Sequence, residues 1–328
     1  MSITVLAAGM LTTVQDGGRS GHAALGVGRA GAMDPVALRL ANTLVGNDIL
    51  VGNVNNASAL EITLRGPHLR FDNDTLIAIT GADITAHCDG KPVLPWRPAV
   101  LRAGSELTLG AMPRGTRSYL AVAGGIDVMP MLGSRSTDIN SKLGGRVLAA
   151  GDVLAIATTR KITSENHRVI AGNWSLDPRP WFDPDPQTPI RVIAGTHFPH
   201  LDNASQRALF ATAFRIDADS NRVGYRLRGA TLALREPLEL VSAGVVPGTV
   251  QLPPGGDPIL LMAEAPTCGG YPRIAQVITV DLPRLAQRPP GGMVRFAETS
   301  LDEAQTRYLE RERALARIAR IVAERLHG

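Results

Sequence analysis

Short apolar segments separated by turn residues run along most of the chain. Several of them alternate apolar and polar residues, which is typical of half-buried antiparallel strands, and Gly, Pro, Asn and Asp lie between them. We therefore predict a mainly β protein. The strands are expected at residues 3–6, 59–64, 76–80, 106–109, 118–122, 190–193, 239–241, 249–252, 259–262, 274–280 and 293–296.

Two segments break this pattern and predict helices. Asp34 can cap the first helix, Pro35 suits its first turn, and Gly46 can end it. Ser300 and Glu303 form a capping box ahead of the second helix, whose charged face we interpret as solvated rather than as a nucleic-acid contact. The apolar stripe of the first helix consists of Ala37, Leu40, Ala41 and Leu44.

Residues 175–188 form the predicted connector between two β-rich halves of similar size. Four prolines and three aspartates in this stretch suit an exposed linker. We expect an N-terminal half at residues 1–180, which carries the Asp34 helix, a C-terminal half at 188–300 and a charged helix at 301–328.

The composition is that of a globular protein and argues against several classes of function. Of the 328 residues, 44% are hydrophobic and 20% are charged, and the net charge of +4 has no basic run, which disfavours nucleic-acid binding. Only Cys88 and Cys268 occur, so we predict a reducing cytoplasm rather than a disulfide framework. The N-terminus is typical of a first strand rather than of a signal peptide, and no apolar run is long enough for a membrane span.

Familiar site patterns are incomplete or lacking. Residues 26–31 match G-x-G-x-x-G, but without a preceding strand or a βαβ unit we prefer a glycine-rich loop, which can still hold an anion, over a dinucleotide site. No P-loop or Met-Lys-Met biotin site occurs, so ATP or biotin would bind elsewhere or arrive with another chain. We predict no metal, because His197 and His200 lack a completing cluster, and interpret Cys268 as a packing residue rather than a nucleophile.

The segment after the predicted buried strand at residues 259–262 carries the most informative chemistry. Glu264 stands where that strand ends, and APTCGGYPRI follows it. Gly269 and Gly270 let the backbone approach a ligand closely, while Thr267 and Tyr271 add hydroxyl groups. Taken alone, this segment fits a ligand-binding loop and a polar hairpin turn equally well.

Three further clusters combine arginine with hydroxyl, amide or carboxylate groups. The planar fork of arginine suits carboxylate, phosphate or carbamate groups. Each cluster alone favours a structural role, but together they indicate a polar site that a plain β scaffold does not require. The clusters are 12–19, which holds Asp16 and Arg19, 133–138, which holds Arg135, and 220–226, which holds Asn221 and Arg222.

Long motifs in a fixed order give the chain a family resemblance. They are TTVQDGGRSGH, GRAGAMDPVALRLANTLVGN, ALEITLRGP, YLAVAGGIDV with GSRSTD, SNRVGYRLRG and VPGTVQLPPGGDPILLMAEAPTCGGYP. With these motifs the chain resembles, over about residues 3–300, the allophanate hydrolase subunit 2 family. This family is also called the KipA-like or biotin-dependent carboxyltransferase family, and it includes the C subunit of bacterial 5-oxoprolinase.

The resemblance implies two tandem cyclophilin-like β-barrel domains and a role in a multi-subunit enzyme that acts on an amide or lactam. In a 5-oxoprolinase, ATP is used by the assembled complex, the partner is a KipI-like subunit 1, also termed the B subunit, and a LamB/YcsF-like A subunit can take part. In a urea carboxylase or allophanate hydrolase system, carboxybiotin comes from a separate carrier. A third alternative is a non-catalytic KipA-like regulator. We expect the chain to be inactive without its partners.

The resemblance also implies the site residues. Asp16 and Glu264, one from each half, match the catalytic acids, and we expect them to converge on one cleft and accept N–H bonds from the amide nitrogen. Arg19 or Arg222 is expected to hold an anion. The implied substrate-binding residues are Arg19, Arg135, Asn221, Arg222, Gln251, Thr267, Gly269, Gly270 and Tyr271.

The chain departs from the family pattern near these residues. Glu264 stands where aspartate is usual, Pro266 and Cys268 alter a Gln-Thr-Thr pattern, and His22 replaces a tyrosine. One extra methylene moves a carboxylate by about 1 Å, which is enough to affect catalysis. The resemblance therefore leaves the substrate open.

Overall fold

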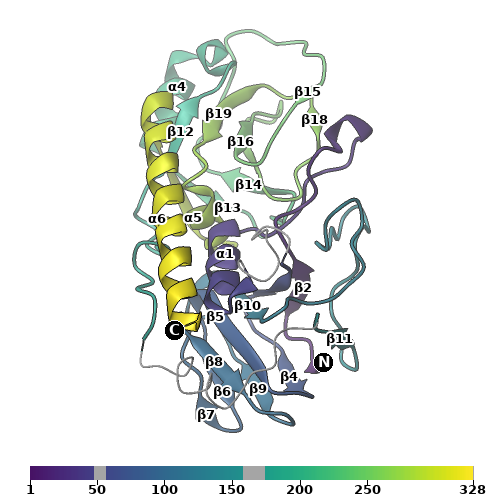
Figure 1. The fold of residues 1–328 in the computed structure, drawn as a ribbon. Coiled ribbons are helices and arrows are strands. Elements are labelled where there is room, and N and C mark those ends of the chain that lie inside the picture. The colour runs from purple at the N-terminus through teal and green to yellow at the C-terminus, as the bar shows by residue number, and fades with distance from the viewer. Residues whose placement is uncertain (48–56, 158–173, 328) are drawn as a thin grey trace. The chain divides into compact units, whose positions relative to one another are not determined.

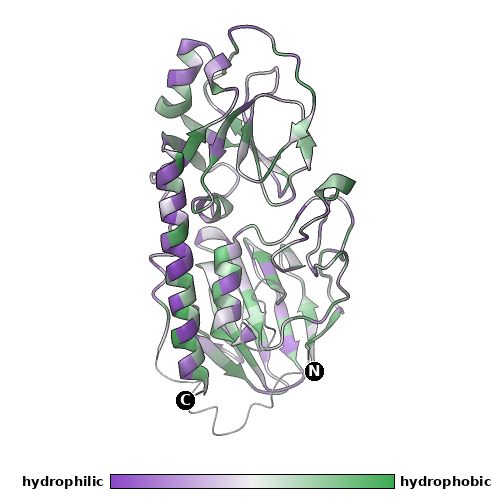
Figure 2. Ribbon diagram, turned by 45° about the horizontal axis from the view of Figure 1, so that its top comes forward, coloured by the Kyte–Doolittle hydropathy of each residue, from purple (hydrophilic) through white to green (hydrophobic). Residues whose placement is uncertain are grey.

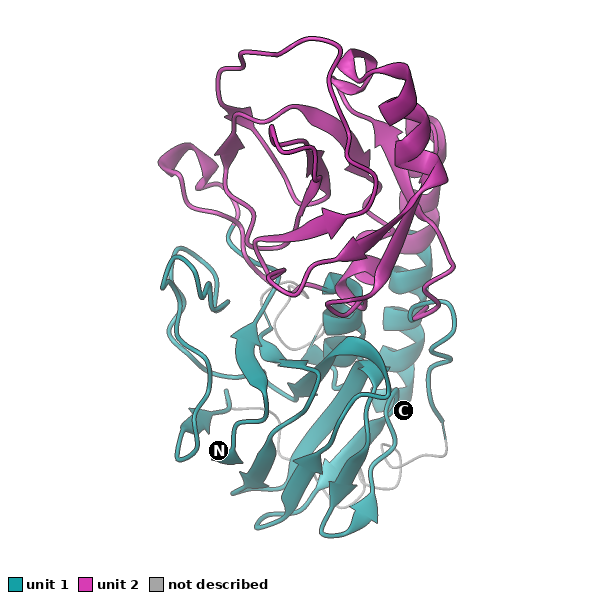
Figure 3. Ribbon diagram, turned by 180° about the vertical axis from the view of Figure 1, so that it is seen from behind, with its two compact units in different colours: residues 1–19, 34–182, 313–328 teal, residues 20–33, 183–312 magenta. Residues whose placement is uncertain are grey.

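A computed structural model describes residues 1–47, 57–157 and 174–327, which fold mainly as β-strands with four α-helices (Figure 1). The predicted mainly β class, with a few short helices and a C-terminal helix, is confirmed. The chain forms two compact units, coloured separately in Figure 3. Unit 1 contains residues 1–19, 34–182 and 313–328, and unit 2 contains residues 20–33 and 183–312.

Unit 1 is built from two antiparallel sheets that share one apolar core. Ile3, Val5 and Phe71 from the first sheet and Ile62 and Leu120 from the second belong to the same buried cluster. The first sheet has the order β11 (Val153–Ala155), β1 (Ser2–Ala7), β4 (His68–Phe71), β9 (Glu106–Leu109), β6 (Ala86–Cys88) and β7 (Lys91–Pro92). The second has the order β2 (Leu11–Gln15), β3 (Ala59–Thr63), β10 (Arg114–Val122), β5 (Thr75–Asp83) and β8 (Pro98–Leu101).

Helix α1 (Pro35–Leu44) forms as its local signals predict. The Asp34 side chain accepts a hydrogen bond from the Ala37 N–H, and Pro35 occupies the first helical turn, where its missing N–H has no partner to lose. The stripe around Leu40 is buried against β5 and β10. The Thr80 hydroxyl, on β5, donates to the Ala37 carbonyl and fixes the helix to the second sheet.

Unit 2 is a closed barrel. All of its strand pairs are antiparallel except β12 with β20, which run parallel. A short antiparallel pair of strands, β15 (Ala243–Gly244) and β18 (Cys268–Gly269), which are not consecutive in the chain, stands outside the barrel sheet. The barrel order is β12 (Ile190–Ala194), β19 (Arg273–Val277), β16 (Thr249–Gln251), β17 (Ile259–Leu261), β14 (Gly224–Arg228), β13 (Ala213–Ile216) and β20 (Met293–Glu298).

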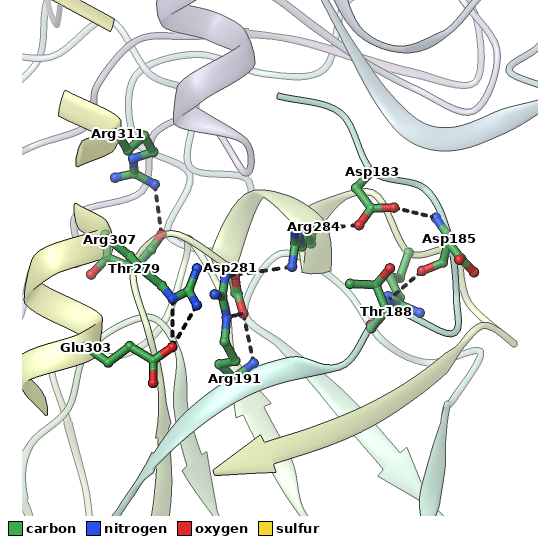
Figure 4. A network of polar contacts seen from close by, with 11 residues as sticks. Asp183, Asp185, Thr188, Arg191, Thr279, Asp281, Arg284, Glu303, Arg307 and Arg311 are labelled. Atoms are coloured by element: carbon green, nitrogen blue, oxygen red, sulfur yellow. Dashed lines mark hydrogen bonds and ion pairs between the residues drawn. The ribbon is translucent and has the colours of Figure 1, made fainter. Parts of the chain in front are cut away.

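A buried carboxylate ties helix α5 (Leu282–Ala286) to the barrel, as Figure 4 shows. Asp281 is fully buried and accepts from the Arg191 guanidinium at 2.6 Å and from the Arg191 backbone N–H at 2.8 Å. These bonds raise the pKa of Arg191. Arg284 lies 3.6 Å from Asp281 and 3.6 Å from Asp183, so this cluster of charges is compensated within unit 2.

Helix α6 (Leu301–His327) contributes to both units, with residues 301–312 in unit 2 and 313–328 in unit 1. Half of its predicted capping box is present, because the Glu303 N–H donates to the Ser300 hydroxyl at 3.1 Å, whereas the Glu303 carboxylate accepts from Thr299 and Arg307. Leu315 packs into the core of unit 1, while most of the helix is hydrophilic and exposed (Figure 2). Within the described residues, no helix combines the length and apolarity needed to cross a bilayer.

One predicted strand is wrong, and helix α5 and one further helix were not predicted. Residues 239–241 have no regular structure, because they lie in an irregular segment that follows Pro237. Helix α4 (Asn203–Ala211) begins at Asp202, whose carboxylate accepts from the Ser205 N–H. Only Ser205 and Leu209 of this helix are buried, so its sequence lacks the apolar stripe that would have revealed it.

Candidate functional site

Asp16 follows β2 in unit 1 and is 2% exposed. Its Oδ1 accepts from the Gly18 N–H at 2.8 Å, the Ser134 hydroxyl at 2.6 Å and the Ser136 hydroxyl at 2.5 Å. Its Oδ2 accepts from the Arg135 N–H at 2.6 Å. A carboxylate offers about four acceptor positions, two on each oxygen. Oδ1 is therefore saturated, and Oδ2 keeps room for one further donor.

Arg19 is a buried cation beside this carboxylate loop, 2% exposed. Its Nη2 donates to the Ser136 carbonyl, whereas its Nε and Nη1 have no hydrogen-bond partner among the described residues. Both unpaired nitrogens are closed off from solvent. Gly144 has a φ of +74°, and a Cβ there would collide with Arg19 Nη2 and the Ser136 carbonyl, so only glycine fits this position.

Arg135 is bound within unit 1 by its own neighbours. Its Nε donates to the Val128 carbonyl at 3.0 Å, and its Nη2 lies 3.7 Å from the Asp127 carboxylate. The side chain is 30% exposed. Arg135 therefore meets Asp16 through its backbone N–H, while its guanidinium is directed to residues 127–128.

Glu264 and Arg222 form a buried ion pair in unit 2. Arg222 Nε donates to Glu264 Oε1 at 2.5 Å, and the two side chains are 5% and 0% exposed. The Arg222 Nη2 donates to the Gly31 carbonyl at 2.5 Å, and the Glu264 N–H donates to the Arg222 carbonyl at 2.8 Å. Removing one partner of such a pair leaves an uncompensated buried charge, which costs about 3–5 kcal/mol.

The glycine-rich stretch 26–31 packs against this ion pair. The 3-10 helix Ala23–Leu25, not a strand, precedes it, and the stretch itself is a loop, as predicted. A Cβ at Gly28 would lie 3.0 Å from the Ala265 carbonyl, directly after Glu264. The loop thus covers the segment that carries the acid.

The loop after Glu264 runs into β18, which pairs with β15. The Thr267 carbonyl accepts from the Val245 N–H at 3.2 Å. Gly269 faces Gln251, since a Cβ there would come within 2.5 Å of Gln251 Nε2. Gln251 is buried, and its Nε2 has no hydrogen-bond partner among the described residues. Gly270 is exposed, as is Tyr271 at 45%.

Asn221 is exposed and forms a local turn. Its side-chain oxygen accepts from the Val223 N–H at 2.8 Å, and its N–H donates to the Gly224 carbonyl at 3.2 Å. This turn orients the chain as it enters β14, one residue after Arg222.

The structure groups the predicted residues within each unit. Asp16, Arg19 and the Arg135 backbone meet around residues 133–138 in unit 1, and Arg222 meets Glu264 in unit 2. The prediction missed the individual roles of Ser134, Ser136 and Gly144. The hydroxyl-rich GSRSTD sequence was the signal for the two serines.

His197 is bonded to the backbone through one of its ring nitrogens. Its Nδ1 accepts from the Arg273 N–H at 3.1 Å, and burial together with the Arg273 charge lowers the pKa of His197. Within the described part of the chain, no three His, Cys, Asp or Glu side chains lie close enough together to hold a metal ion.

Comparisons with known proteins place the chain in a family. A profile of the carboxyltransferase domain, subdomain A and B, matches residues 25–298. The chain is 42% identical to the C subunit of 5-oxoprolinase from Escherichia coli strain K12 over 317 residues, covering 94% of this chain and 96% of that protein. It is 37% identical to the C subunit of 5-oxoprolinase from Haemophilus influenzae, covering 95% of this chain and 96% of that one.

A solved structure gives the same result for the fold. The K. lactis urea amidolyase matches with a TM-score of 0.81 at 28% identity, covering 97% of this chain and 20% of the amidolyase. The family resemblance inferred from the motifs is confirmed by the profile and by both 5-oxoprolinase relatives. The chain belongs to the carboxyltransferase-domain family that comprises subdomains A and B.

Proposed function

We propose that this chain is the C subunit of a 5-oxoprolinase, a hydrolase that opens 5-oxoproline to L-glutamate with ATP. The supporting observation is its 42% identity to the E. coli protein of that name across nearly the full length of both chains. The proposed partners are a KipI-like B subunit and a LamB/YcsF-like A subunit, in the cytoplasm. ATP is used by the assembled complex, and the chain alone is inactive.

In this proposal the two acids face the lactam N–C=O group, and Asp16 binds its single N–H. Oδ2 of Asp16 has the acceptor capacity for this bond, because only the Arg135 N–H occupies it. Glu264 is held in place by Arg222 at 2.5 Å and takes the second role: it accepts a proton from the water that attacks the carbonyl carbon and returns it to the ring nitrogen as the C–N bond breaks. Carboxylates fixed in advance need no reorganisation when substrate binds.

Of the two candidate anion anchors, we assign Arg19. The Arg222 guanidinium is already committed to Glu264 and to the Gly31 carbonyl. Arg19 has two nitrogens without hydrogen-bond partners among the described residues, so its charge is the less compensated. Because these nitrogens are shielded from solvent, anchoring a substrate carboxylate requires the Arg19 loop to open. The remaining predicted residues, Arg135, Asn221, Gln251, Thr267, Gly269, Gly270 and Tyr271, complete the proposed substrate site.

The test is reconstitution with the A and B subunits, followed by measurement of ATP-dependent glutamate release from 5-oxoproline. Asp16→Asn and Glu264→Gln should each lower turnover by about tenfold or more. The exposed Asp219→Asn and Glu324→Gln are matched controls and should leave it unchanged. The double variant shows whether both acids serve one substrate, because their effects are then non-additive. Near-normal rates in both single variants would reject the catalytic roles of the two acids, whereas a wild-type chain that binds its partner without supporting turnover would favour a KipA-like regulator.

A carboxyltransferase function is the second candidate. It is supported by the similarity to K. lactis urea amidolyase, of which this chain matches one fifth of the length. In that function a separate carrier supplies carboxybiotin, and the same acids bind urea through its N–H groups. Urea-dependent consumption of carboxybiotin, without glutamate release from 5-oxoproline, would favour it.

A further inference from the structure

Two consecutive glycines, Gly144 and Gly145, cross over the residues that hold Arg19 in unit 1. A Cβ at Gly144 would collide with Arg19 Nη2 and with the Ser136 carbonyl. A Cβ at Gly145 would lie 3.2 Å from Thr137 Oγ1. Both glycines have a positive φ, +74° and +128°, which residues with a side chain rarely adopt. The backbone at this crossing therefore lies as close to its neighbours as only glycine allows.

The two side chains bonded to the carbonyls of Ser136 and Thr137 are buried but only partly hydrogen-bonded. Arg19 donates from Nη2 to the Ser136 carbonyl, while its Nε and Nη1 have no partner among the described residues. Gln15 is fully buried and donates from Nε2 to the Thr137 carbonyl at 2.8 Å. That bond fixes the orientation of the amide, and Gln15 Oε1 has no partner in the described part of the chain.

These unpaired groups favour an anion that enters together with water. A buried guanidinium without bonds to its N–H groups has lost its hydration and gained no replacement. Arg19 also forms no ion pair with any other described residue. Water alone would satisfy the hydrogen bonds of Arg19 but not its charge, whereas a carboxylate satisfies both. A water molecule that accompanies the carboxylate would supply the donor that Gln15 Oε1 lacks.

Residues 139–146, which we call the glycine strap, cover Arg19 with few bonds. Every residue of the strap is exposed or half-buried. The turn of the strap is closed on its own base, where the Leu143 N–H donates to the Asp138 carbonyl at 3.1 Å. Within the described residues, neither Gly144 nor Gly145 makes a hydrogen bond. Lifting the two glycines therefore breaks no hydrogen bond of their own.

The floor below the strap is held firmly by comparison. The Thr137 N–H donates to the Val14 carbonyl at 2.9 Å, and the Asp16 N–H donates to the Ser136 hydroxyl at 2.8 Å. Both bonds attach the floor to the end of β2, and β2 pairs with β3 along its whole length. Access to Arg19 therefore requires a movement of the strap and not of the floor.

We infer that the glycine strap is a gate over a carboxylate subsite whose cation is Arg19. The strap lifts to let the substrate carboxylate reach the unpaired nitrogens of Arg19, and it closes again over the bound group, with Gly144 and Gly145 as its hinge. This inference rests on the proposed function, because 5-oxoproline carries one carboxylate beside its lactam ring. Closure excludes water from that carboxylate and strengthens its attraction to the guanidinium.

Hydrogen exchange of the strap amides, followed by mass spectrometry, tests the gate in the wild-type complex with the A and B subunits. A non-hydrolysable ATP analogue is present, so that 5-oxoproline binds without being consumed. Saturating 5-oxoproline should slow exchange in residues 139–146 by about tenfold or more. The same lactam ring without the carboxylate, 2-pyrrolidone, should not slow it. The exposed turn at residues 89–90 in unit 1 is the internal control and should exchange equally fast in all samples.

Gly145→Ala tests the hinge, and Gly151→Ala is its matched control. Both glycines have a positive φ, but only Gly145 has a neighbour against its added Cβ, so alanine there disfavours the closed strap. Gly145→Ala should speed strap exchange in the absence of substrate. It should also raise the KM for 5-oxoproline by about fivefold or more while kcat stays that of the wild type. Gly151→Ala should change neither quantity.

The outcomes separate the gate from the proposed function. If the wild-type complex releases glutamate with ATP but 5-oxoproline leaves strap exchange unchanged, the gate is wrong and the function stands. Protection without glutamate release would keep the gate and reject the hydrolase, and the lack of both would reject both. Equal protection by 2-pyrrolidone would overturn the carboxylate subsite, and a Gly145→Ala variant that matches Gly151→Ala would overturn the hinge. The exchange measurement uses wild-type protein, so it decides the matter even where a variant does not fold.

Discussion

Replacing Asp16 by asparagine removes one acceptor from a carboxylate that holds four donors. With the amide oxygen in place of Oδ1, the new NH₂ group faces the Arg135 N–H, and two donors oppose each other. With the amide reversed, the NH₂ group faces the Gly18 N–H instead, although the serine hydroxyls can turn to accept. In either orientation one backbone N–H loses its acceptor.

The expected loss of stability follows from this count of hydrogen bonds. A hydrogen bond to a charged group contributes about 1.5–3 kcal/mol, and a buried donor left unpaired costs about 1–3 kcal/mol. We therefore expect Asp16→Asn to lower the free energy of unfolding of unit 1 by about 2–4 kcal/mol. For a domain of this size the midpoint should fall by roughly 5–15 °C. Ser134→Ala removes one donor to the carboxylate together with the acceptor of the Ser136 N–H, and should cost about 1.5–3 kcal/mol.

Denaturant and thermal unfolding of the isolated chain, followed for unit 1, measure these changes. The exposed Asp219→Asn is the control and should lie within about 0.5 kcal/mol of the wild type. If Asp16→Asn is as stable as that control, the four-bond geometry is wrong. Activity then separates the two roles of Asp16. Turnover is measured at temperatures at which the variants stay folded. If Asp16 is purely structural, Asp16→Asn keeps normal turnover. If Asp16 binds substrate, Asp16→Asn lowers turnover and Ser134→Ala does not.

Three further predictions concern other parts of the two units. Glu264→Gln should lower turnover and should also lower the unfolding free energy of unit 2 by about 3 kcal/mol, because Arg222 loses its buried counter-charge. Denaturation and activity are measured on the same variant, and an unchanged stability would contradict the buried pair. Gly144→Ala should destabilise unit 1 by more than Gly151→Ala, since both glycines have positive φ but only the first is crowded, by Arg19 and Ser136; equal unfolding midpoints would reject that packing. The pKa of His197 lies below its ordinary 6.5 because of burial and the Arg273 charge, so the unfolded chain binds the proton first and stability is lost as the pH falls below 6.5. His197→Gln should therefore flatten the stability curve below pH 6.5 and leave its slope above that pH unchanged, as denaturation at several pH values would show.

The elements with strong local signals were predictable from the sequence. Helix α1 has a capping aspartate, a proline in its first turn and a continuous apolar stripe, so its start at Pro35 needed no tertiary information. The strand at 106–109 was predicted with its observed bounds, because its alternation marks one buried face. Helix α4 lacks such a stripe, and its position is set by packing against β20.

The residue types along the sequence could identify the site clusters, but not which side chains bond to each other. The partners of Asp16 other than Gly18 are separated from it by about 120 residues, and Arg222 is 42 residues from Glu264. Such pairs depend on strand register, which a single sequence fixes only weakly. The same holds for the bond from Arg19 to the Ser136 carbonyl, which joins residues 117 positions apart.

The burial of both acids does not by itself argue against catalysis, since a supporting shell of hydrogen bonds is what holds a reacting group in position. It does restrict what each acid can do. The Asp16 carboxylate cannot rotate without breaking bonds to two serines and two backbone N–H groups, so it is suited to orient an N–H with its one remaining acceptor position. Glu264 is paired with Arg222, so a change that draws Arg222 away alters the charge environment of Glu264. Variants of Arg222 should therefore change turnover through Glu264, whereas variants of Ser134 should change stability first.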